Sequence, residues 1–411
     1  MRLSTLILAG FTIFVGIVVQ YVLQRKRRAE DEAISQRYGC QPAPRLQNRR
    51  PFGVDRLEQI FRADAESRLM ELLLFHFRQT GNTLEQKFLG TKAYGTIEPA
   101  NLEAIFSTSF KDFGMGPRRD ITFPMFGDGI FTQEGVEWKH SRDILRPQLQ
   151  HKQYENLEVF RPAVDDLIGL LQESNGTVDL QTLFFRLTLD TTTAFLFGES
   201  VRSLVTPEAI EENTFANAFN TAQQWVTKRF RLLDLYWLIN GREFRQACDN
   251  VHKFADQILI AIFPPSALQM DIQGEIASSC TMDISLNRED LRRMPYLNNV
   301  LKETLRLYPS VPVNTRTATR TTVLPTGGGP DRKSPVLIPK GSAVAFSVYS
   351  MHRRPDLYGM DAELFRPERW DEKMPMKNDP TNVKWGYLPF HGGPRICLGP
   401  EFFEPARNIV T

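Results

Sequence analysis

An uncharged stretch near the N-terminus constrains the fold of this chain more than any other feature. Residues 3–23 read LSTLILAGFTIFVGIVVQYVL and contain no charged side chain. At about 1.5 Å per residue, a helix of this length crosses a hydrocarbon core of roughly 30 Å. A cleaved signal peptide is the alternative, but a basic run follows the stretch instead of a small-residue cleavage site. The sequence therefore predicts a membrane-spanning helix over residues 1–24.

The residues that follow predict the orientation of the chain and a linker. Residues 25–28 carry four positive charges, whereas Arg2 alone precedes the stretch, so the bulk of the protein is expected on the cytosolic side. Residues 41–55 hold three prolines and no apolar periodicity, which is typical of a stiff connector. We therefore expect a basic, proline-rich linker over residues 25–51 and a folded domain over residues 52–411.

The composition excludes several classes of protein. The chain has 411 residues, of which 42% are hydrophobic and 24% are charged, as in ordinary globular proteins. Its 50 Lys and Arg and 48 Asp and Glu leave a net charge of +2, which gives no electrostatic basis for binding nucleic acid. Four cysteines without a CxxC pair exclude a disulfide framework and disfavour a structural zinc site. Three of them, Cys40, Cys248 and Cys280, are expected to be buried and inert.

The spacing of apolar residues predicts a mainly α-helical body with small β sheets. Leu57, Ile60 and Phe61 begin a three- and four-residue periodicity that continues to Phe77. Further helical stretches begin at residues 101, 134, 156, 183, 207 and 243, and the last one spans 290–307. Strand signals lie at residues 319–325, 336–339 and 343–348. The three glycines at 327–329 lack the Gly-Lys-Ser/Thr of a phosphate loop and predict a turn.

One segment near the C-terminus carries residues suited to metal chemistry. Residues 390–399 read FHGGPRICLG and fit the heme-thiolate pattern F-x-x-G-x-R-x-C-x-G. A cysteine that ligates heme iron must remain an anion, so its loop needs backbone N–H groups near sulfur and glycines that permit a tight turn. Gly393 and Gly399 supply that freedom, and Arg395 adds a positive charge that helps to keep the Cys397 thiolate ionised.

Other motifs agree with this one, and together they resemble the cytochrome P450 family. Glu303-Thr304-Leu305-Arg306 matches the E-x-x-R of that family. Other segments share this spacing, but only this one is followed by Leu-Tyr-Pro and later by FRPERW at residues 365–370. The resemblance implies that Glu303, Arg306 and Arg369 form a structural triad behind the heme. A buried carboxylate is tolerated there because two arginines pair with it.

The resemblance also implies a set of heme contacts. The cofactor would be heme b, with Cys397 as the axial ligand of its iron and Arg395 paired with a propionate. Trp138 and Arg142 match W-x-x-x-R and lie on one helical face, from which both reach one propionate. Taken alone, that pattern fits an exposed helix with a packed indole equally well. Arg316 would supply a further propionate contact.

Longer runs resemble one branch of the family. Residues 183–200, 298–318, 322–341 and 347–370 are similar to the fungal P450s that oxidise alkane and fatty-acid chain ends. This implies hydroxylation of an aliphatic, lipid-like substrate with O2 and with electrons from NADPH through NADPH-cytochrome P450 reductase. A single-pass protein of the endoplasmic reticulum membrane with a cytosolic catalytic domain is expected. An alternative is a tailoring enzyme of a fungal secondary-metabolite pathway.

The resemblance offers candidates for the substrate pocket. They are Phe126, Phe131, Val311, Val313 and Asn314, and for each of them ordinary core packing is the alternative. His352 and His391 are expected to be surface or packing residues, because the thiolate already fills the proximal position of the iron.

Two family features are not found in this chain, so the P450 fold is expected to be incomplete. The distal helix should carry A/G-G-x-D/E-T-T, but the run Asp190-Thr191-Thr192 lacks the preceding glycine and belongs to an earlier helix. Residues 263–271 would span only about 12 Å as a helix, too little to cross a heme. After Gly399 the chain continues as PEFFEPARNIVT instead of a long apolar helix, and Pro405 would interrupt one. A third hypothesis is therefore an inactive, truncated P450 or a pseudoenzyme that at most binds heme or partners at the membrane.

Overall fold

The computed structural model describes residues 2–46, 49–88, 91–148, 157–174, 176–197, 200–205, 215–262 and 294–399. The chain divides into two compact units. The first, here called the sheet unit, comprises Met1–Gly116 and Tyr296–Thr411, and the second, the helical unit, comprises Pro117–Pro295.

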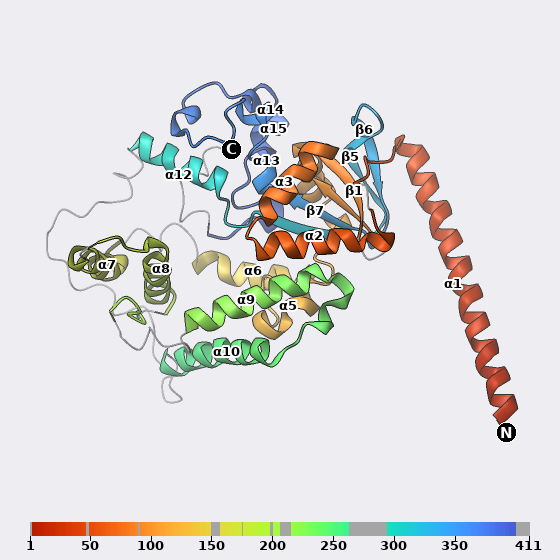
Figure 1. Ribbon diagram of the computed structural model, residues 1–411, viewed down its shortest axis with the longest axis horizontal. Helices are drawn as coiled ribbons and strands as arrows, with labels where there is room; N and C mark the ends of the chain where they lie inside the picture. Colours follow the sequence, from red (N-terminus) through yellow and green to blue (C-terminus); the bar gives the residue numbers. More distant parts are fainter. Residues whose placement is uncertain are drawn as a thin grey trace. The chain divides into compact units, whose positions relative to one another are not determined.

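The sheet unit begins with a long helix, α1, Arg2–Tyr38, which Figure 1 shows as one unbroken helix. Its last turns contact the second sheet, where the Thr321 hydroxyl donates to Asp31 Oδ1 at 2.6 Å. Among the described side chains, no helix is both long and apolar enough to cross a membrane. The membrane helix expected over residues 1–24 includes positions 1–10, 12, 13 and 17, whose side chains lie outside that description.

A five-stranded sheet organises the sheet unit, in the order β1-β2-β7-β4-β3. Its strands are β1 Thr83–Phe88, β2 Thr91–Thr96, β3 Phe113–Gly114, β4 Val313–Ala318 and β7 Ala343–Ser347. The β1–β2 hairpin is antiparallel, β2 pairs in parallel with β7, and β7 pairs antiparallel with β4. The pairing of β2 with β7 joins the two segments of chain that make up this unit.

A second sheet consists of the hairpin β5 Thr322–Gly328 and β6 Ser334–Ile338. The strands predicted at 319–325, 336–339 and 343–348 are therefore confirmed as β5, β6 and β7. The turn predicted at the three glycines begins only at the last of them, because Gly327 and Gly328 end β5 and Gly329 starts the connection to β6. Gly327 has φ +112°, and a Cβ at Gly327 would lie 2.3 Å from the Thr83 side chain. A Cβ at Gly328 would lie 2.4 Å from the Gln41 carbonyl oxygen, so the end of β5 needs glycine for close approach.

Helices cover the sheets of this unit. They are η1 Pro51–Gly53, α2 Val54–Ala65, α3 Leu69–Thr80, α4 Pro99–Glu103, the π-helical turn η2 Ala104–Thr108, η3 Phe110–Asp112, α12 Pro295–Leu307, α13 Val348–Met351, α14 Pro355–Tyr358, η8 Pro367–Trp370, η9 Pro375–Asn378, α15 Pro380–Trp385 and η10 Gly393–Arg395. One apolar core runs from the sheet strands to Tyr387 and Leu388. Ala43 belongs to this core, so part of the segment expected to be a connector packs against the body.

The helical unit contains α5 Arg118–Phe126, α6 Gly135–Gln148, η5 Leu157–Phe160, α7 Arg161–Glu173, α8 Leu180–Phe197, α9 Phe215–Arg231, η7 Leu233–Leu238 and α10 Arg242–Ile262. One core joins α5, α9 and α10 around Ala222 and Phe244, and another joins α7 and α8. The helices predicted from residues 134, 156, 183 and 243 are confirmed. The start predicted at 207 and the deletion predicted near 263–271 lie outside the described residues.

Candidate functional site

The segment that holds Cys397 is a tightly folded loop, residues 388–399, here called the cysteine loop. Its backbone turns at His391 and Gly393, which have φ +62° and +68°. The Cys397 N–H donates to the Phe390 carbonyl at 3.1 Å. The two ends of the motif are therefore held side by side by a backbone hydrogen bond.

The described cysteines differ in exposure. Cys397 is exposed, Cys248 is buried and Cys40 is half-buried, whereas Cys280 lies outside the described residues. Burial raises the pKa of Cys248 to about 11 and also raises the pKa of Cys40. The expectation of a buried, inert thiol is thus confirmed for Cys248, while the Cys397 sulfur is open to a ligand.

Close packing explains the glycines of the cysteine loop. A Cβ at Gly393 would lie 1.9 Å from the Phe106 carbonyl oxygen, and a Cβ at Gly392 would lie 2.6 Å from the Trp385 ring. Neither distance is possible for a real side chain. The loop is therefore seated directly on the π-helical turn η2 and on Trp385, as the tight turn predicted from the sequence requires.

His391 fastens the cysteine loop to strand β4. Its Nε2 lies 3.1 Å from Asn314 Nδ2, and Asn314 Oδ1 accepts from the Thr315 N–H at 2.8 Å. Because that oxygen faces the backbone, the Asn314 amide presents its N–H to His391. The His391 ring also lies 5.9 Å from the Phe106 ring and 5.7 Å from the Phe346 ring. The expectation of a packing residue is confirmed.

The structure brings Arg316 close to the cysteine loop. It lies on β4, is only 5% exposed, and donates from Nη1 to the Thr315 carbonyl at 2.8 Å. Its guanidinium lies 5.7 Å from the centres of both the Phe106 and Phe346 rings, the same rings that flank His391. Arg395 belongs to the loop itself, two residues before Cys397.

Trp138 and Arg142 lie elsewhere, on α6 in the helical unit. The Arg142 guanidinium is 5.8 Å from the centre of the Trp138 ring, so the two side chains share one helical face, as their spacing predicts. Both side chains are half-buried. Their contact with a common propionate stays a prediction.

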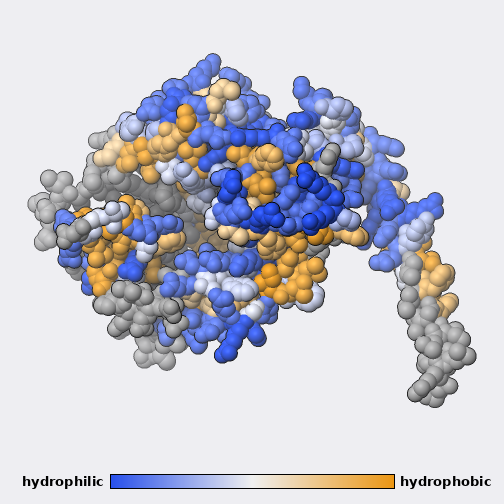
Figure 2. All heavy atoms as spheres, viewed as in Figure 1, coloured by the Kyte–Doolittle hydropathy of each residue, from blue (hydrophilic) through white to orange (hydrophobic). Residues whose placement is uncertain are grey.

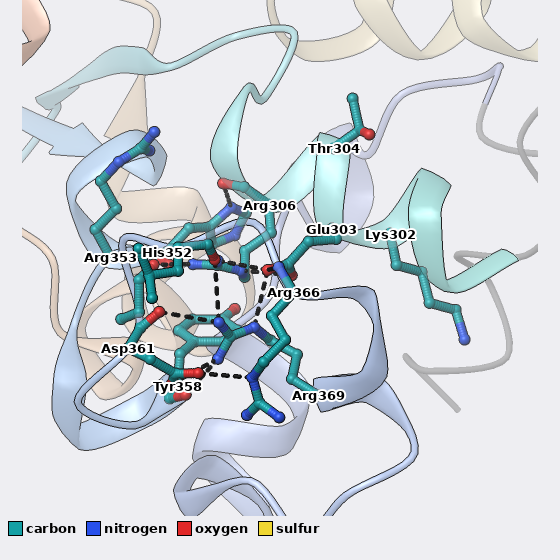
Figure 3. Close-up of polar contacts among 12 residues, drawn as sticks. Lys302, Glu303, Thr304, Arg306, His352, Arg353, Tyr358, Asp361, Arg366 and Arg369 are labelled. Atoms are coloured by element: carbon teal, nitrogen blue, oxygen red, sulfur yellow. Dashed lines mark hydrogen bonds and ion pairs between the residues drawn. The ribbon is translucent and has the colours of Figure 1, made fainter. Parts of the chain in front are cut away.

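The predicted structural triad is confirmed. The Glu303 carboxylate accepts from Arg306 at 2.8 Å, from Arg369 at 2.9 Å and from Trp370 Nε1 at 3.2 Å, as Figure 3 shows for the two arginines. Glu303, Arg306 and Arg369 are all completely buried. Burial alone would raise the pKa of Glu303, but the hydrogen bonds from Arg306 and from the Arg366 N–H lower it overall. The carboxylate therefore stays ionised within a fully paired network.

His352 connects this network to the cysteine loop, which the sequence did not predict. It is completely buried. Its Nδ1 lies 3.0 Å from the Arg306 carbonyl oxygen, and its Nε2 accepts from the Leu388 N–H at 2.9 Å. The expectation of a surface or packing residue holds only in the packing sense. The local sequence YSMHRRP has no signal that separates a buried imidazole from an exposed one.

The pocket candidates are divided between the units. Phe126 and Phe131 belong to the helical unit, with ring centres 6.2 Å apart, and are 38% and 66% exposed. Val311 is 42% exposed in the sheet unit, where Val313 and Asn314 lie half-buried on β4. Among these candidates, Asn314 contacts the cysteine loop through His391.

Asp190 has a structural role, as expected. It is 1% exposed on α8. Its two carboxylate oxygens accept from the N–H groups of Ser203 at 2.6 Å and Leu204 at 3.0 Å. Because these bonds tie a following loop to the helix, the Asp-Thr-Thr run is not the acid and alcohol pair of a distal helix.

Comparisons with known proteins agree with the motifs. The model of the family described as Cytochrome P450 matches residues 63–263 and 266–404. A cytochrome P450 of Arthroderma benhamiae is 38% identical over 94% of this chain and 86% of its own length. Cytochrome P450 52A1 of Candida tropicalis is 37% identical over 80% of this chain and 73% of its own. Cytochrome P450 52A12 of Debaryomyces hansenii is 33% identical over 98% and 89%.

Two details of these matches concern the interior of the chain. The family match is interrupted between residues 263 and 266, where a short segment was expected to replace a helix. The alignment with the Arthroderma benhamiae relative extends over 452 positions, more than the 411 residues of this chain, so it contains gaps opposite residues of the relative. The matches cover most of this chain and most of each relative, and the motif geometry agrees with them. The chain therefore belongs to the cytochrome P450 family.

Proposed function

We propose that this chain is a heme-thiolate monooxygenase in which Cys397 is the axial ligand of the iron. The family is one of heme-thiolate enzymes, and the observation that carries the assignment is the exposed Cys397 thiol at the end of the cysteine loop. The residues present fit the cofactor. A Cβ at Gly399 would meet only the Cys397 sulfur, at 4.0 Å, so no described side chain crowds that position. When bound, the heme supplies the activation of dioxygen for insertion of an oxygen atom into a C–H bond.

The protein's own residues would bind and orient the cofactor. Arg316 and Arg395 supply guanidinium groups for the heme propionates, because such groups bind carboxylates in a planar, two-pronged geometry. Trp138 and Arg142 supply an indole N–H and a third guanidinium from one helical face. The rings of Phe106 and Phe346 support the Arg316 guanidinium and keep it from rotating freely.

The proposed substrate is an aliphatic, lipid-like molecule, and the proposed electron donor is NADPH-cytochrome P450 reductase. The support is the resemblance of residues 183–200, 298–318, 322–341 and 347–370 to fungal P450s that oxidise alkane and fatty-acid chain ends. A second candidate is a heme-binding protein without efficient turnover. It is favoured by the interruption of the family match between residues 263 and 266.

We also propose that the first part of α1 anchors the protein in the endoplasmic reticulum membrane, with the catalytic domain on the cytosolic side. Phe14, Val18 and Val22 are 63%, 42% and 58% exposed on this helix. In Figure 2 the described part of α1 carries hydrophobic surface beside hydrophilic surface. Removal of residues 1–24 is expected to shift the protein from the membrane fraction, resistant to alkaline extraction, to the soluble fraction. An unchanged membrane fraction would contradict the anchor.

The ligand assignment is tested by the ferrous carbon monoxide spectrum. The wild-type chain is expected to show the red-shifted Soret band of a thiolate-ligated heme, and Cys397→Ser is expected to abolish that band. Cys40→Ser is the control, because the half-buried Cys40 has no role in heme binding under this proposal. A wild-type spectrum with only the band of a histidine-ligated heme would refute Cys397 as the ligand.

A further inference from the structure

His352 is a buried side chain of the sheet unit whose contacts the proposed function does not yet use. It follows α13, is completely buried, and stacks on the Tyr387 ring at a centroid distance of 5.2 Å. Both ring nitrogens have polar neighbours, Arg306 and Leu388. An imidazole that only filled space would not need both of these contacts.

The partners determine the tautomer of His352. The Leu388 backbone N–H can only donate, so Nε2 must accept its hydrogen bond. Nδ1 therefore carries the proton and donates to the Arg306 carbonyl oxygen. Burial lowers the pKa of His352 to about 3, which keeps this neutral form at physiological pH.

The two partners belong to different parts of the site. The Arg306 carbonyl lies in the last turn of α12, where helix carbonyls lack partners within the helix. Leu388 is the first residue of the cysteine loop and stands two residues before Phe390, whose carbonyl accepts from the Cys397 N–H. One imidazole thus connects the triad helix with the backbone that holds Cys397.

Two tyrosine hydroxyls form hydrogen bonds on either side of the backbone that leads into Leu388, whose N–H donates to His352. Tyr358 donates its hydroxyl to the Gly386 carbonyl at 2.8 Å, and Tyr387 donates its hydroxyl to the Lys302 carbonyl at 3.1 Å. These bonds fix the chain just before the loop, and His391 fixes it further on. Between these contacts, the His352 side chain holds Leu388, the first residue of the cysteine loop, by accepting its N–H hydrogen bond.

We infer that His352 is a positioning residue of the cysteine loop, and that it acts through the Nε2 acceptor that holds Leu388. The inference rests on the proposed function for its last step, in which the position of the loop sets the approach of the Cys397 sulfur to heme iron. The contact between His352 and the loop does not depend on heme. The two steps can therefore be tested separately.

Two substitutions separate the hydrogen bond from packing. In His352→Gln the side-chain amide extends to the place of Nε2 and retains an acceptor for Leu388. In His352→Asn the shorter amide reaches only the place of Nδ1, so it retains the bond to Arg306 and loses the one to Leu388. Both variants remove the imidazole ring, so they serve as matched controls for lost packing and for changes in melting temperature.

The first measurement is hydrogen–deuterium exchange of the full-length chain without added heme, followed on peptides that cover residues 386–399. In His352→Asn, exchange there is expected to be about tenfold faster, as the loss of one hydrogen bond implies. His352→Gln is expected to stay close to wild type. Equal exchange in the two variants would overturn the inference. If neither variant folds, His352→Ala with and without imidazole replaces them, and failure of imidazole to restore protection would overturn it too.

The second measurement is the ferrous carbon monoxide spectrum after heme loading. His352→Asn is expected to lose most of the thiolate band, whereas His352→Gln is expected to retain it. A wild-type chain without that band would refute the proposed function, and the exchange data would then still decide whether His352 holds the loop. Retention of the full band by His352→Asn would overturn the last step of the inference.

Discussion

At the scale of single residues, the position of Cys397 depends on neighbouring residues that are not expected to bind heme themselves. The sequence predicted the tight turn and the role of Gly393, because glycine adopts a left-handed backbone without a steric cost. It could not predict that the Phe106 carbonyl lies where a Cβ at Gly393 would be, within 1.9 Å of it, or that Asn314 contacts His391. Those contacts join residues far apart in the chain, and no local pattern records them.

Gly393→Ala tests the seating of the cysteine loop. The new Cβ would clash with the Phe106 carbonyl and would also be strained at φ +68°. We expect the free energy of unfolding to fall by about 3 kcal/mol or more, together with loss of the thiolate band. Gly39→Ala is the control, because Gly39 has φ +62° but nothing within 4 Å of an added Cβ. Equal destabilisation of the two variants, measured by chemical denaturation, would show that the contact with Phe106 does not matter.

Two buried histidines are expected to lower the stability of the sheet unit as the pH decreases. Burial, with the nearby Arg56, lowers the pKa of His76 to about 4, and burial lowers that of His352 to about 3. Below pH 6.5 the unfolded chain binds protons at these positions and the folded chain does not, so stability falls as the pH decreases towards 4. Each histidine contributes a slope of roughly 1.4 kcal/mol per pH unit. His76→Gln, which still accepts from Arg56, is expected to reduce the slope, and an unchanged slope in denaturation at pH 4–6.5 would contradict the assignment.

At the scale of elements, helices were more predictable than strands because their signal is local. The apolar periodicity of residues 57–77 predicted α2 and α3, whereas β1, β2, β3 and β4 were missed. The strand β2, TKAYGT, has few apolar residues and forms by pairing with β7, about 250 residues later in the chain. Such long-range pairing leaves little trace in a short window of sequence. The structural triad was predictable because a motif on α12 and a second motif on η8 both mark it.

Glu303→Gln tests the triad. The amide removes the charge that balances Arg306 and Arg369, both completely buried, so we expect a loss of about 3–5 kcal/mol in the free energy of unfolding. Glu363→Gln is a matched control, because Glu363 and Arg366 have the same E-x-x-R spacing but Glu363 forms an exposed ion pair with Arg78. That change is expected to cost less than about 1 kcal/mol. Similar losses in the two variants, measured by denaturant titration, would contradict a special role for Glu303.

At the scale of the whole molecule, the residues expected to bind heme come from two units. Arg316, Arg395 and Cys397 belong to the sheet unit, and Trp138 and Arg142 belong to the helical unit. Within the sequence of the helical unit, the family match is interrupted between residues 263 and 266. The sequence alone predicted a short replacement for the distal helix there, because the Asp-Thr-Thr motif was found only at residues 190–192.

The interruption of the family match predicts how much hydroxylated product the chain forms for each NADPH consumed. The acid and alcohol pair that the family resemblance implies for the distal helix would supply protons for oxygen activation, whereas the Asp190 carboxylate already accepts hydrogen bonds from the N–H groups of Ser203 and Leu204. We therefore expect the chain to consume NADPH with little hydroxylated product. In the sheet unit, the α12 side chains Leu297 and Leu301 are 39% and 36% exposed, and Tyr308, which follows this helix, is 69% exposed, an apolar surface that a further helix would cover.

A chimera in which the aligned segment of the Arthroderma benhamiae relative replaces residues 252–294 is expected to raise the ratio of product to NADPH consumed and to lower the binding of a hydrophobic dye. The physical reason is that a distal helix, which the family resemblance implies for the relative, would supply the acid and alcohol pair and cover the apolar face of α12. A chimera that exchanges only residues 161–197, which form α7 and α8, is the control and is expected to leave both measurements unchanged. Efficient coupling by the original chain with a fatty acid or alkane would contradict the expected loss of the relay. Equal ratios in the original chain and the first chimera would show that the interruption does not limit turnover.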